Sequence, residues 1–317
     1  MSDDAIPGVR FDLHELVALR GRVAQLAKLA HRTSAETLSG SNQSPFRGRG
    51  MEYAESRPYA PGDDVRHIDW RVTARTGRTH TKLFQPERER TTAVVYDRAA
   101  SMAFGTRVCF KSVQAARLAA LMLWLAARDG HRLAAAGCDA KIELMPPLGG
   151  RRGVLRVLDA LVRWQPQVDQ SAADDQAGNA ARALDALRRA LRPGSQILLL
   201  LDPRSVDERV ATAVASLRRH HDLAACLLVD PIEQVPPPQD IYRIGDGRQT
   251  GRLHLDTRSA RERWRTHFTR LQAGAVERLQ RTGARVALVA TDADPVDALA
   301  ALLRGKAAGR SPEKVAV

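Results

Sequence analysis

The segment SQILLLLD, residues 195–202, is the clearest buried strand in the sequence, and it ends on an acid, Asp202. Two other apolar segments end in the same way, TTAVVYD at residues 91–97 and LAACLLVD at residues 223–230. A strand that is apolar on both faces needs cover on both sides, which is the situation inside a parallel sheet. These segments therefore predict strands of such a sheet.

Segments with a helical pattern separate the strands. They are about ten to twenty residues long, and this alternation is typical of a parallel sheet covered by helices on both faces. The sequence predicts a doubly wound, mostly parallel α/β domain over residues 91–305, interrupted by an irregular excursion at residues 231–256. The expected helices span residues 110–130, 154–164, 179–191, 206–221, 258–281 and 294–304, and the further strands span residues 132–138, 141–145 and 284–290.

Residues 1–90 are expected to form an N-terminal region that packs on this domain. A helix is predicted at residues 11–31 because apolar residues recur there at spacings of three and four. Residues 39–50 are rich in glycine and serine and should form a mobile loop, and residues 306–317 should form a flexible tail. The apolar stripe of the helix consists of Leu16, Leu19, Val23, Leu26 and Ala30.

The composition of the 317 residues excludes several classes of protein. The chain is 44% hydrophobic and 27% charged, which is a globular balance rather than a disordered or fibrous one. Cys109, Cys138 and Cys226 lie far apart without metal-ligand spacing, which excludes a zinc finger and a disulfide framework. No apolar run approaches about eighteen residues, and the N-terminus lacks the pattern of a secretory signal. We therefore expect a soluble cytoplasmic protein.

The formal net charge is +13, and its most basic stretch lies at residues 248–285, with ten arginines and three acidic residues. Arg258, Arg261 and Arg265 share one face of the helix expected there. This face is either a solvated outer surface or a contact for an acidic partner or a phosphate backbone. No aromatic residues interleave with the arginines, so nucleic-acid binding is kept only as the alternative function.

Two predicted strands end in Asp97 and Asp202, and Ser101 follows four residues after the first. In open parallel sheets, ligands bind beyond the carboxyl ends of the strands, where the strand order reverses. Two carboxylates and a hydroxyl could hold Mg²⁺ there, or the acids could cap helices or pair with arginines. A metal-dependent hydrolase that uses Asp97 and Asp202 is a third hypothesis. Ser101 lacks the Gly-x-Ser-x-Gly pattern of a nucleophile.

Residues 55–89 form the most unusual stretch. Pro61, Gly62, Asp63 and Asp64 have turn chemistry, and a strand is expected at residues 79–84. The stretch is interpreted as a charge-paired loop that apolar anchors, Trp70 above all, fix in place. A catalytic carboxylate site and a partner-docking surface are the alternatives. The expected anchors are Val65, Ile68 and Trp70, the matched charges are Arg66, Asp69, Arg71 and Arg75, and the alternative catalytic acids are Asp63, Asp64 and Asp69.

The same stretch resembles the signature of the domain-of-unknown-function 58 (DUF 58) family, whose members carry a von Willebrand factor A-like domain. The resemblance covers residues 45–300. The matching residues are Glu52, Arg57, Tyr59, Pro61, Gly62, Asp63, Asp64, Arg66, Ile68, Asp69, Trp70, Ala74, Arg75, Lys82, Phe84 and Glu87, followed by Asp97 to Met102, Phe104 to Thr106, Asp230 to Glu233, and Thr250 with Gly251.

Such domains usually hold a metal with an Asp, two serines, a threonine and a second Asp. By this resemblance Asp97, Ser101 and Asp202 are the metal ligands, but Ala99 replaces the first serine. The threonine is missing, since none occurs between Thr106 and Thr212. Loss of two oxygen donors weakens Mg²⁺ binding, so no cofactor is expected, and Mg²⁺ at this degenerate site is the alternative.

The resemblance implies a protein-interaction adaptor rather than an enzyme. Relatives are typically encoded beside a MoxR-type AAA+ ATPase and are thought to act with it in chaperone-like assembly or maturation of client proteins. The chain lacks a Walker sequence and is not itself that ATPase. Some relatives have transmembrane helices, which are absent here, so the protein is expected to be free in the cytoplasm or attached to a membrane only peripherally.

Overall fold

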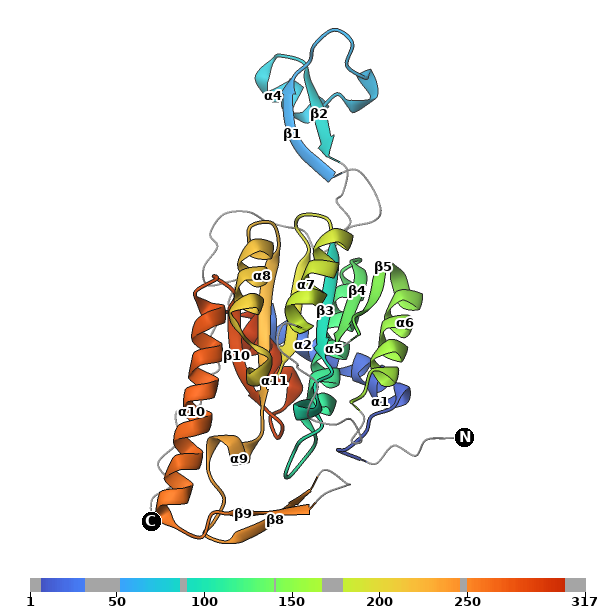
Figure 1. Cartoon of the computed structure of the whole chain (residues 1–317). Helices are drawn as coiled ribbons and strands as arrows, with labels where there is room; N and C mark the ends of the chain where they lie inside the picture. The colour runs from blue at the N-terminus through green and yellow to red at the C-terminus, as the bar shows by residue number, and fades with distance from the viewer. Residues whose placement is uncertain are drawn as a thin grey trace. The chain divides into compact units, whose positions relative to one another are not determined.

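The computed structural model describes residues 7–31, 52–85, 90–139, 141–166, 179–245 and 250–305 (Figure 1). The chain divides into two compact units. Residues 38–89 form the smaller unit, and residues 1–37 and 90–317 form the larger one. The loop expected at residues 39–50 and the tail expected at residues 306–317 lie outside the described residues.

The larger unit is built on a six-stranded sheet with the strand order β10-β7-β6-β3-β4-β5. Neighbouring strands are parallel except at one edge, where β5 runs antiparallel to β4. Numbered by their succession along the chain, the strands lie in the order 3-2-1-4-5-6, which is that of doubly wound folds. The strands are β3 (Thr91–Asp97), β4 (Arg132–Cys138), β5 (Glu143–Leu148), β6 (Gln196–Leu201), β7 (Asp222–Val229) and β10 (Arg285–Ala290).

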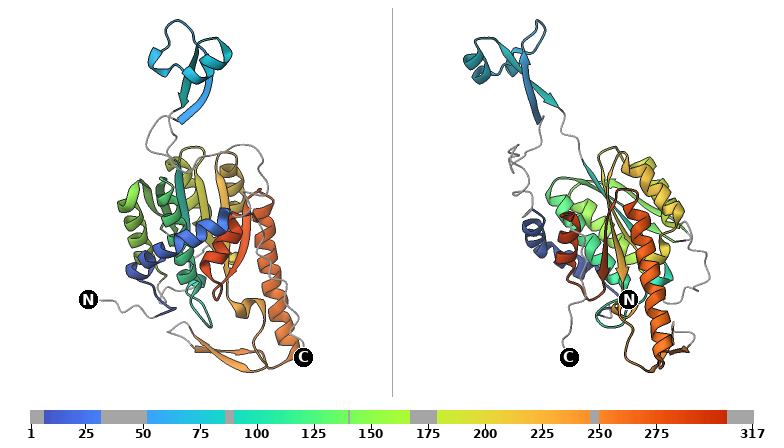
Figure 2. Two further views of the ribbon diagram at one scale, coloured as in Figure 1. Left: turned by 180° about the vertical axis from the view of Figure 1, so that it is seen from behind. Right: turned by 90° about the vertical axis from the view of Figure 1, so that its left-hand side faces the viewer.

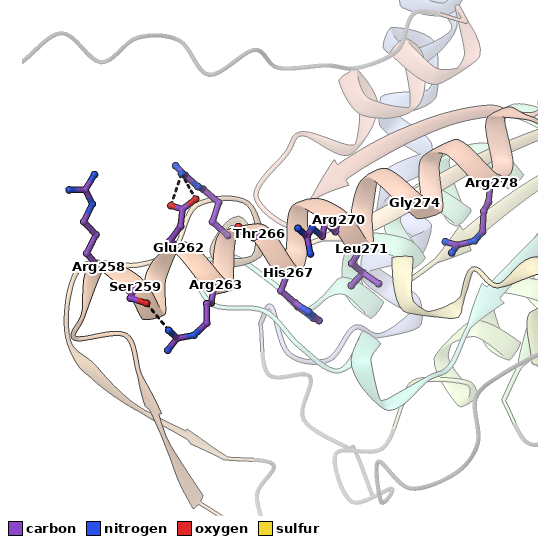
Figure 3. Close-up of a pocket in the computed structure, with 11 residues that line it drawn as sticks. Arg258, Ser259, Glu262, Arg263, Thr266, His267, Arg270, Leu271, Gly274 and Arg278 are labelled. Atoms are coloured by element: carbon purple, nitrogen blue, oxygen red, sulfur yellow. Dashed lines mark hydrogen bonds and ion pairs between the residues drawn. The ribbon is translucent and has the colours of Figure 1, made fainter.

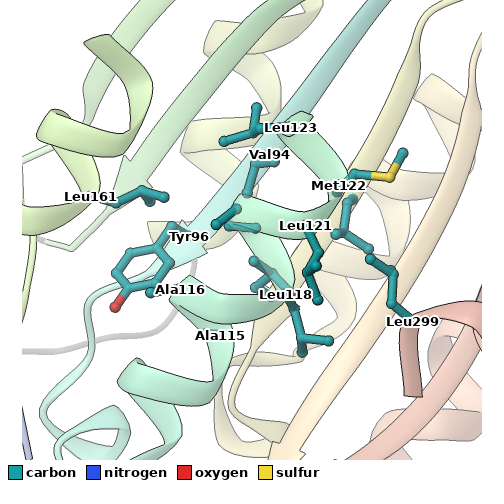
Figure 4. Packing of buried hydrophobic residues seen from close by; sticks show 14 of the residues in the cluster. Val94, Tyr96, Ala115, Ala116, Leu118, Leu121, Met122, Leu123, Leu161 and Leu299 are labelled. Atoms are coloured by element: carbon teal, nitrogen blue, oxygen red, sulfur yellow. The ribbon is translucent and has the colours of Figure 1, made fainter. Parts of the chain in front are cut away.

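Helices cover both faces of this sheet because the side chains of each strand alternate between two apolar cores. Val94 and Tyr96 of β3 enter one core with the long helix α5, and Figure 4 shows this packing. Ala93 and Val95 enter the other core. The predicted doubly wound α/β fold is confirmed. The first core contains α5 (Lys111–Arg128), α6 (Gly150–Arg163) and α11 (Pro295–Leu303), and the second contains α7 (Asn179–Ala190), α8 (Glu208–Arg218) and α10 (Arg258–Gln280).

The N-terminal helix packs on the first face, as expected from its apolar stripe. It is divided into α1 (Leu13–Ala18), a 3₁₀ turn (Leu19–Arg22) and α2 (Val23–His31). Leu16 and Leu26 are fully buried, and Trp124 Nε1 of α5 donates a hydrogen bond to the Leu16 carbonyl oxygen at 3.1 Å. Figure 2 shows these helices beside α11, with α8 and α10 on the opposite face. The helix therefore belongs with the sheet, whereas the prediction grouped residues 1–90 together.

The excursion expected at residues 231–256 is more regular than predicted. It contains a short helix, α9 (Pro231–Gln234), and an antiparallel hairpin of β8 (Ile241–Gly245) and β9 (Thr250–His254). The prolines between α9 and β8 concealed the short strand pattern. In the described part of the chain, no helix combines the length and apolarity needed to cross a bilayer.

The smaller unit is a hairpin with a short helix. Strands β1 (Glu52–Pro58) and β2 (His80–Gln85) pair antiparallel, and α4 (Trp70–Thr76) lies between them in the chain. The strand predicted at residues 79–84 corresponds to β2, whereas β1 and α4 were not predicted. Packing of this segment on the sheet stays a prediction.

Candidate functional site

Asp97 and Asp202 lie together at the carboxyl end of the sheet. Asp97 ends β3 and Asp202 follows β6, and these two neighbouring strands flank the point where the strand order reverses. The backbone N–H of Asp202 donates to Asp97 Oδ2 at 3.0 Å, and Ser205 Oγ donates to the same oxygen at 2.5 Å. Ala99 N donates to Asp97 Oδ1 at 2.9 Å. The Asp97 carboxylate therefore joins the two strand ends.

Burial dominates the titration of Asp97. Its side chain is enclosed, and loss of solvation raises its pKa to about 6. The hydrogen bonds from Ser205, Ala99 and Asp202 favour the ionised form and partly oppose this rise, while the nearby negative charge of Asp202 adds to it. The pKa of Asp97 is therefore unusually high for an aspartate, mainly because the side chain is buried.

A buried lysine neutralises the second aspartate. Lys111 is the first residue of α5 and is 0% exposed. Its Nζ lies 2.8 Å from Asp202 Oδ2 and 2.7 Å from Glu233 Oε1. The other oxygen of Asp202 accepts a hydrogen bond from Arg204 N at 2.8 Å, so both oxygens have partners. One ammonium therefore links the start of α5, the end of β6 and α9.

Sequence reasoning missed Lys111 and its pairing with Glu233, which was noted only as part of the family resemblance; one signal for the pairing was present. A helix N-terminus carries partial positive charge, so a lysine as the first helical residue is unfavourable unless acids compensate it. Lys111 begins a nearly apolar helix, and this position could have indicated acids nearby. The acids lie 91 and 122 residues further along the chain, and only the strand order brings them there.

Asp230 forms a second network at the same end of the sheet. It follows β7, is fully buried, and accepts hydrogen bonds from Thr106 N at 2.9 Å and Thr106 Oγ1 at 2.5 Å. Thr291 Oγ1, beyond β10, also donates to it at 2.8 Å. With Glu233 it forms a capping box that starts α9. These hydrogen bonds of Asp230 hold the loop at residues 103–110 at the ends of β7 and β10.

Gly105 lies in this loop at a position with no space for a side chain. A Cβ there would overlap the Cys109 carbonyl oxygen and lie 2.9 Å from Phe110 Cα. We expect Gly105→Ala to lower the free energy of unfolding by about 1–3 kcal/mol, because the loop would have to open. Chemical denaturation measures the loss. Gly21→Ala, at a position with no atom within 4 Å of the added carbon, is the matched control. Equal stability of the two variants would contradict the tight loop.

Ser101, the third metal ligand implied by the resemblance, does not join the two aspartates through a hydrogen bond. Its Oγ is buried and has no hydrogen-bond partner among the described residues. Ala99 contributes only its backbone N–H to Asp97. Nor does the described part of the chain contain a group of three or more His, Cys, Asp or Glu side chains arranged to hold a metal ion. Because Lys111 already places a positive charge on Asp202 and the other oxygens of Asp97 and Asp202 accept hydrogen bonds, these residues do not fit a divalent cation.

In the smaller unit, the carboxylates fix turns and helix starts. Asp63 accepts hydrogen bonds from Ala60 N at 2.9 Å and Arg57 at 2.6 Å, and the bond from Ala60 is the main cause that lowers its pKa. Asp69 caps α4 and accepts from Ser56 Oγ at 2.9 Å, and its pKa is lowered chiefly by the Val72 N–H. Asp64 caps a 3₁₀ turn. These acids are engaged in structure, which favours the charge-paired interpretation.

Within the smaller unit, the expected anchors of this segment are mostly exposed. Trp70 is 70% exposed and Val65 is 63% exposed, and Ile68 is only half-buried. A two-stranded hairpin with one short helix has too little structure to bury a large ring. Gly62 has a φ of 106°, as the predicted turn requires. Of the other signature residues, Pro61, Arg66 and Arg75 are exposed, and Tyr59 is half-buried.

The three arginines predicted to share a face of α10 have different environments. Arg261 donates to the carbonyl oxygens of Pro237 at 3.0 Å and Pro236 at 3.3 Å, so it fastens the loop before β8. Arg265 pairs with both carboxylate oxygens of Glu262 at 2.8 and 2.6 Å. Arg258 is exposed. A continuous face of these three arginines is therefore not formed, and nucleic-acid binding gains no support from them.

A shallow groove of about 1190 Å³ runs along the outer side of α10 (Figure 3). The period of about 3.6 residues in this helix predicts a buried stripe of Trp264, Phe268, Leu271, Ala275 and Leu279. Phe268, Ala275 and Leu279 are buried, whereas Leu271 lines the groove and Gln272 is buried instead. The cationic residues lining the groove are Arg258, Arg263, Arg265, Arg270 and Arg278.

Comparisons with known proteins agree with this description. The model of the family described as "Protein of unknown function DUF58" matches residues 55–290. The uncharacterized proteins Mb1516 of Mycobacterium bovis and Rv1480 of Mycobacterium tuberculosis are each 33% identical to the chain over 205 residues. The match covers 64% of this chain and 63% of each relative, which is less than two thirds of their length.

Two solved structures match part of the chain at low identity and with low TM-scores. One is described as the conserved hypothetical protein BatB from Bacteroides thetaiotaomicron, with 13% identity, a TM-score of 0.45, and coverage of 68% of this chain and 96% of that one. The other is a von Willebrand factor type A structure from Catenulispora acidiphila, with 14% identity, a TM-score of 0.36, and coverage of 72% and 43%.

Proposed function

Because the chain belongs to the DUF58 family, we propose that it is a non-enzymatic adaptor that works with a MoxR-type AAA+ ATPase in the cytoplasm. Its role would be chaperone-like assembly or maturation of other proteins. The observation that carries the proposal is the end of the sheet around Asp97 and Asp202, where ligands bind in this class of fold. The ionic groups there are buried and paired, so this end offers a surface rather than a reactive centre.

The hydrogen bonding at this end supports a role without catalysis. A catalytic carboxylate needs an oxygen free to accept a proton or contact a substrate. Both oxygens of Asp97 and both of Asp202 are already bonded within the protein. A serine nucleophile needs an adjacent base, and Ser101 Oγ has no partner among the described residues. The hydrolase hypothesis therefore lacks a free group.

The exposed residues of this end suit a protein partner. Arg204 follows Asp202, and its guanidinium lies 5.6 Å from the centre of the Phe268 ring and 3.6 Å from Glu233 Oε1. Val108 and Val235, in the loops after β3 and β7, are 56% and 70% exposed. Arginine beside apolar side chains is typical of protein interfaces. We call Arg204, Val108 and Val235 the rim surface.

The test is to measure association of the purified chain with a MoxR-type ATPase of the same organism, with and without ATP. We expect binding, and we expect Arg204→Gln to raise the dissociation constant at least about tenfold, because positioned arginines often dominate interfaces. Arg188→Gln is the control, since this exposed arginine of α7 precedes the opposite, amino end of β6.

The possible results test the ATPase partner and the contact surface independently. No association in either nucleotide state would remove the ATPase as partner. Association that Arg204→Gln and Arg188→Gln leave equally strong would remove the rim surface as the contact. The exposed Trp70 and Val65 of the smaller unit support a second contact, with the client protein.

A further inference from the structure

We propose that the ammonium group of Lys111 serves as a built-in cation in place of a divalent metal ion, so that this end of the sheet works without metal. The inference does not depend on the partner proposed above, because it concerns the isolated chain. It starts from the disagreement between the metal site implied by the resemblance and the residues found there.

The charges at this end of the sheet favour the lysine. Asp202, which the resemblance assigns as a metal ligand, is 1% exposed and needs a positive neighbour, because an unpaired buried carboxylate is costly. Lys111 Nζ supplies that charge at 2.8 Å and neutralises Glu233 at 2.7 Å as well. The Phe104 ring centre lies 5.8 Å from Nζ, close enough for a cation–π contact. The ammonium therefore has partners on several sides.

The oxygen ligands that a divalent ion needs are engaged with other donors at this site. Mg²⁺ prefers about six oxygen ligands, and the ligands that proteins usually supply to it are carboxylate oxygens. Here Asp97 Oδ2 accepts from Asp202 N and Ser205 Oγ, and Asp202 Oδ2 accepts from Lys111. A divalent ion at these oxygens would compete with these donors and would lie beside an ammonium of the same sign. The geometry thus favours the lysine over the ion.

The chain also lacks oxygen donors that the resemblance implies for a metal site. Ala99 stands where the resemblance places a serine and has no side-chain oxygen. Ser101 Oγ is buried and has no hydrogen-bond partner among the described residues, so it is bonded to neither aspartate. A site with fewer oxygen donors and with a buried ammonium between Asp202 and Glu233 is consistent with a permanent internal cation.

The experiment uses the wild-type chain, Lys111→Ala and the control Lys141→Ala, whose side chain is exposed in the loop after β4. Each is titrated with Mn²⁺ by calorimetry, and its thermal midpoint is measured in EDTA and in Mg²⁺. For the wild type and Lys141→Ala we expect no stoichiometric Mn²⁺ binding and the same midpoint in both buffers. For Lys111→Ala we expect a midpoint that is several degrees higher in Mg²⁺ than in EDTA.

Either of two results would overturn the inference. One is binding of one equivalent of Mn²⁺ to the wild type, with a lower midpoint in EDTA. The other is a folded Lys111→Ala protein whose midpoint is the same in Mg²⁺ and EDTA. If Lys111→Ala does not fold, the wild-type titration decides alone.

Discussion

Lys111→Met is expected to lower the free energy of unfolding by about 3–5 kcal/mol, because it leaves two buried acids without their cation. Methionine keeps the length and apolar stem of lysine but removes the charge. Asp202 would then remain buried without the ammonium of Lys111, and Glu233 would keep only the more distant Arg204, 3.6 Å from its Oε1; the exposed fractions of the two acids are 1% and 4%. Urea denaturation of the wild type and the variant measures the difference.

A double variant distinguishes the charge from the packing. Glu233→Gln combined with Lys111→Met removes one of the two buried carboxylates that lose the lysine, so it should recover part of the stability lost in Lys111→Met. Lys141→Met, at an exposed position, should change stability by no more than about 0.5 kcal/mol. A loss below about 1 kcal/mol for Lys111→Met would show that the buried ion network contributes little.

The second large effect concerns pH and Asp97. Burial raises the pKa of this carboxyl from its ordinary 3.8 to about 6 in the folded protein. Between these two values the folded state binds more protons than the unfolded state, so stability decreases as the pH rises. The difference between the two pKa values corresponds to about 3 kcal/mol of stability. This stability is present below about pH 4 and is lost above about pH 6.

This contribution is measured against Asp97→Asn, which cannot ionise. The asparagine amide stays neutral across the whole range, so the variant lacks the contribution that the titration of Asp97 makes. As the pH rises from 4 to 7, the stability of the wild type relative to this variant should fall by up to about 3 kcal/mol. A constant difference across that range would show that Asp97 does not titrate as its burial implies.

Much of the fold could be predicted from local pattern. The apolar segments that end in Asp97 and Asp202 are strands, and the rule for the ends of parallel strands placed these two residues at one edge. The resemblance to the DUF 58 family is confirmed by the family match over residues 55–290. These predictions succeeded because each depends on short stretches of sequence or on the alternation of elements.

The features that were missed depend on contacts between distant segments. The pairing of Lys111 with Glu233 requires both the strand order and the short helix α9, neither of which local pattern gives. The exposure of Trp70 depends on how little structure surrounds it in the smaller unit. The role of Arg261 was misread for a similar reason, since its acceptors are two proline carbonyls more than twenty residues away.

The central claim is that an internal ammonium, and not a metal ion, neutralises the acids at the carboxyl end of the sheet. Crystals of the wild-type chain soaked in Mn²⁺ test it most directly, through an anomalous difference map. The account predicts no peak beside Asp97 or Asp202, with Lys111 Nζ still within hydrogen-bond distance of Asp202 and Glu233. A Mn²⁺ peak coordinated by Asp97 or Asp202, with the Lys111 side chain displaced, would contradict it.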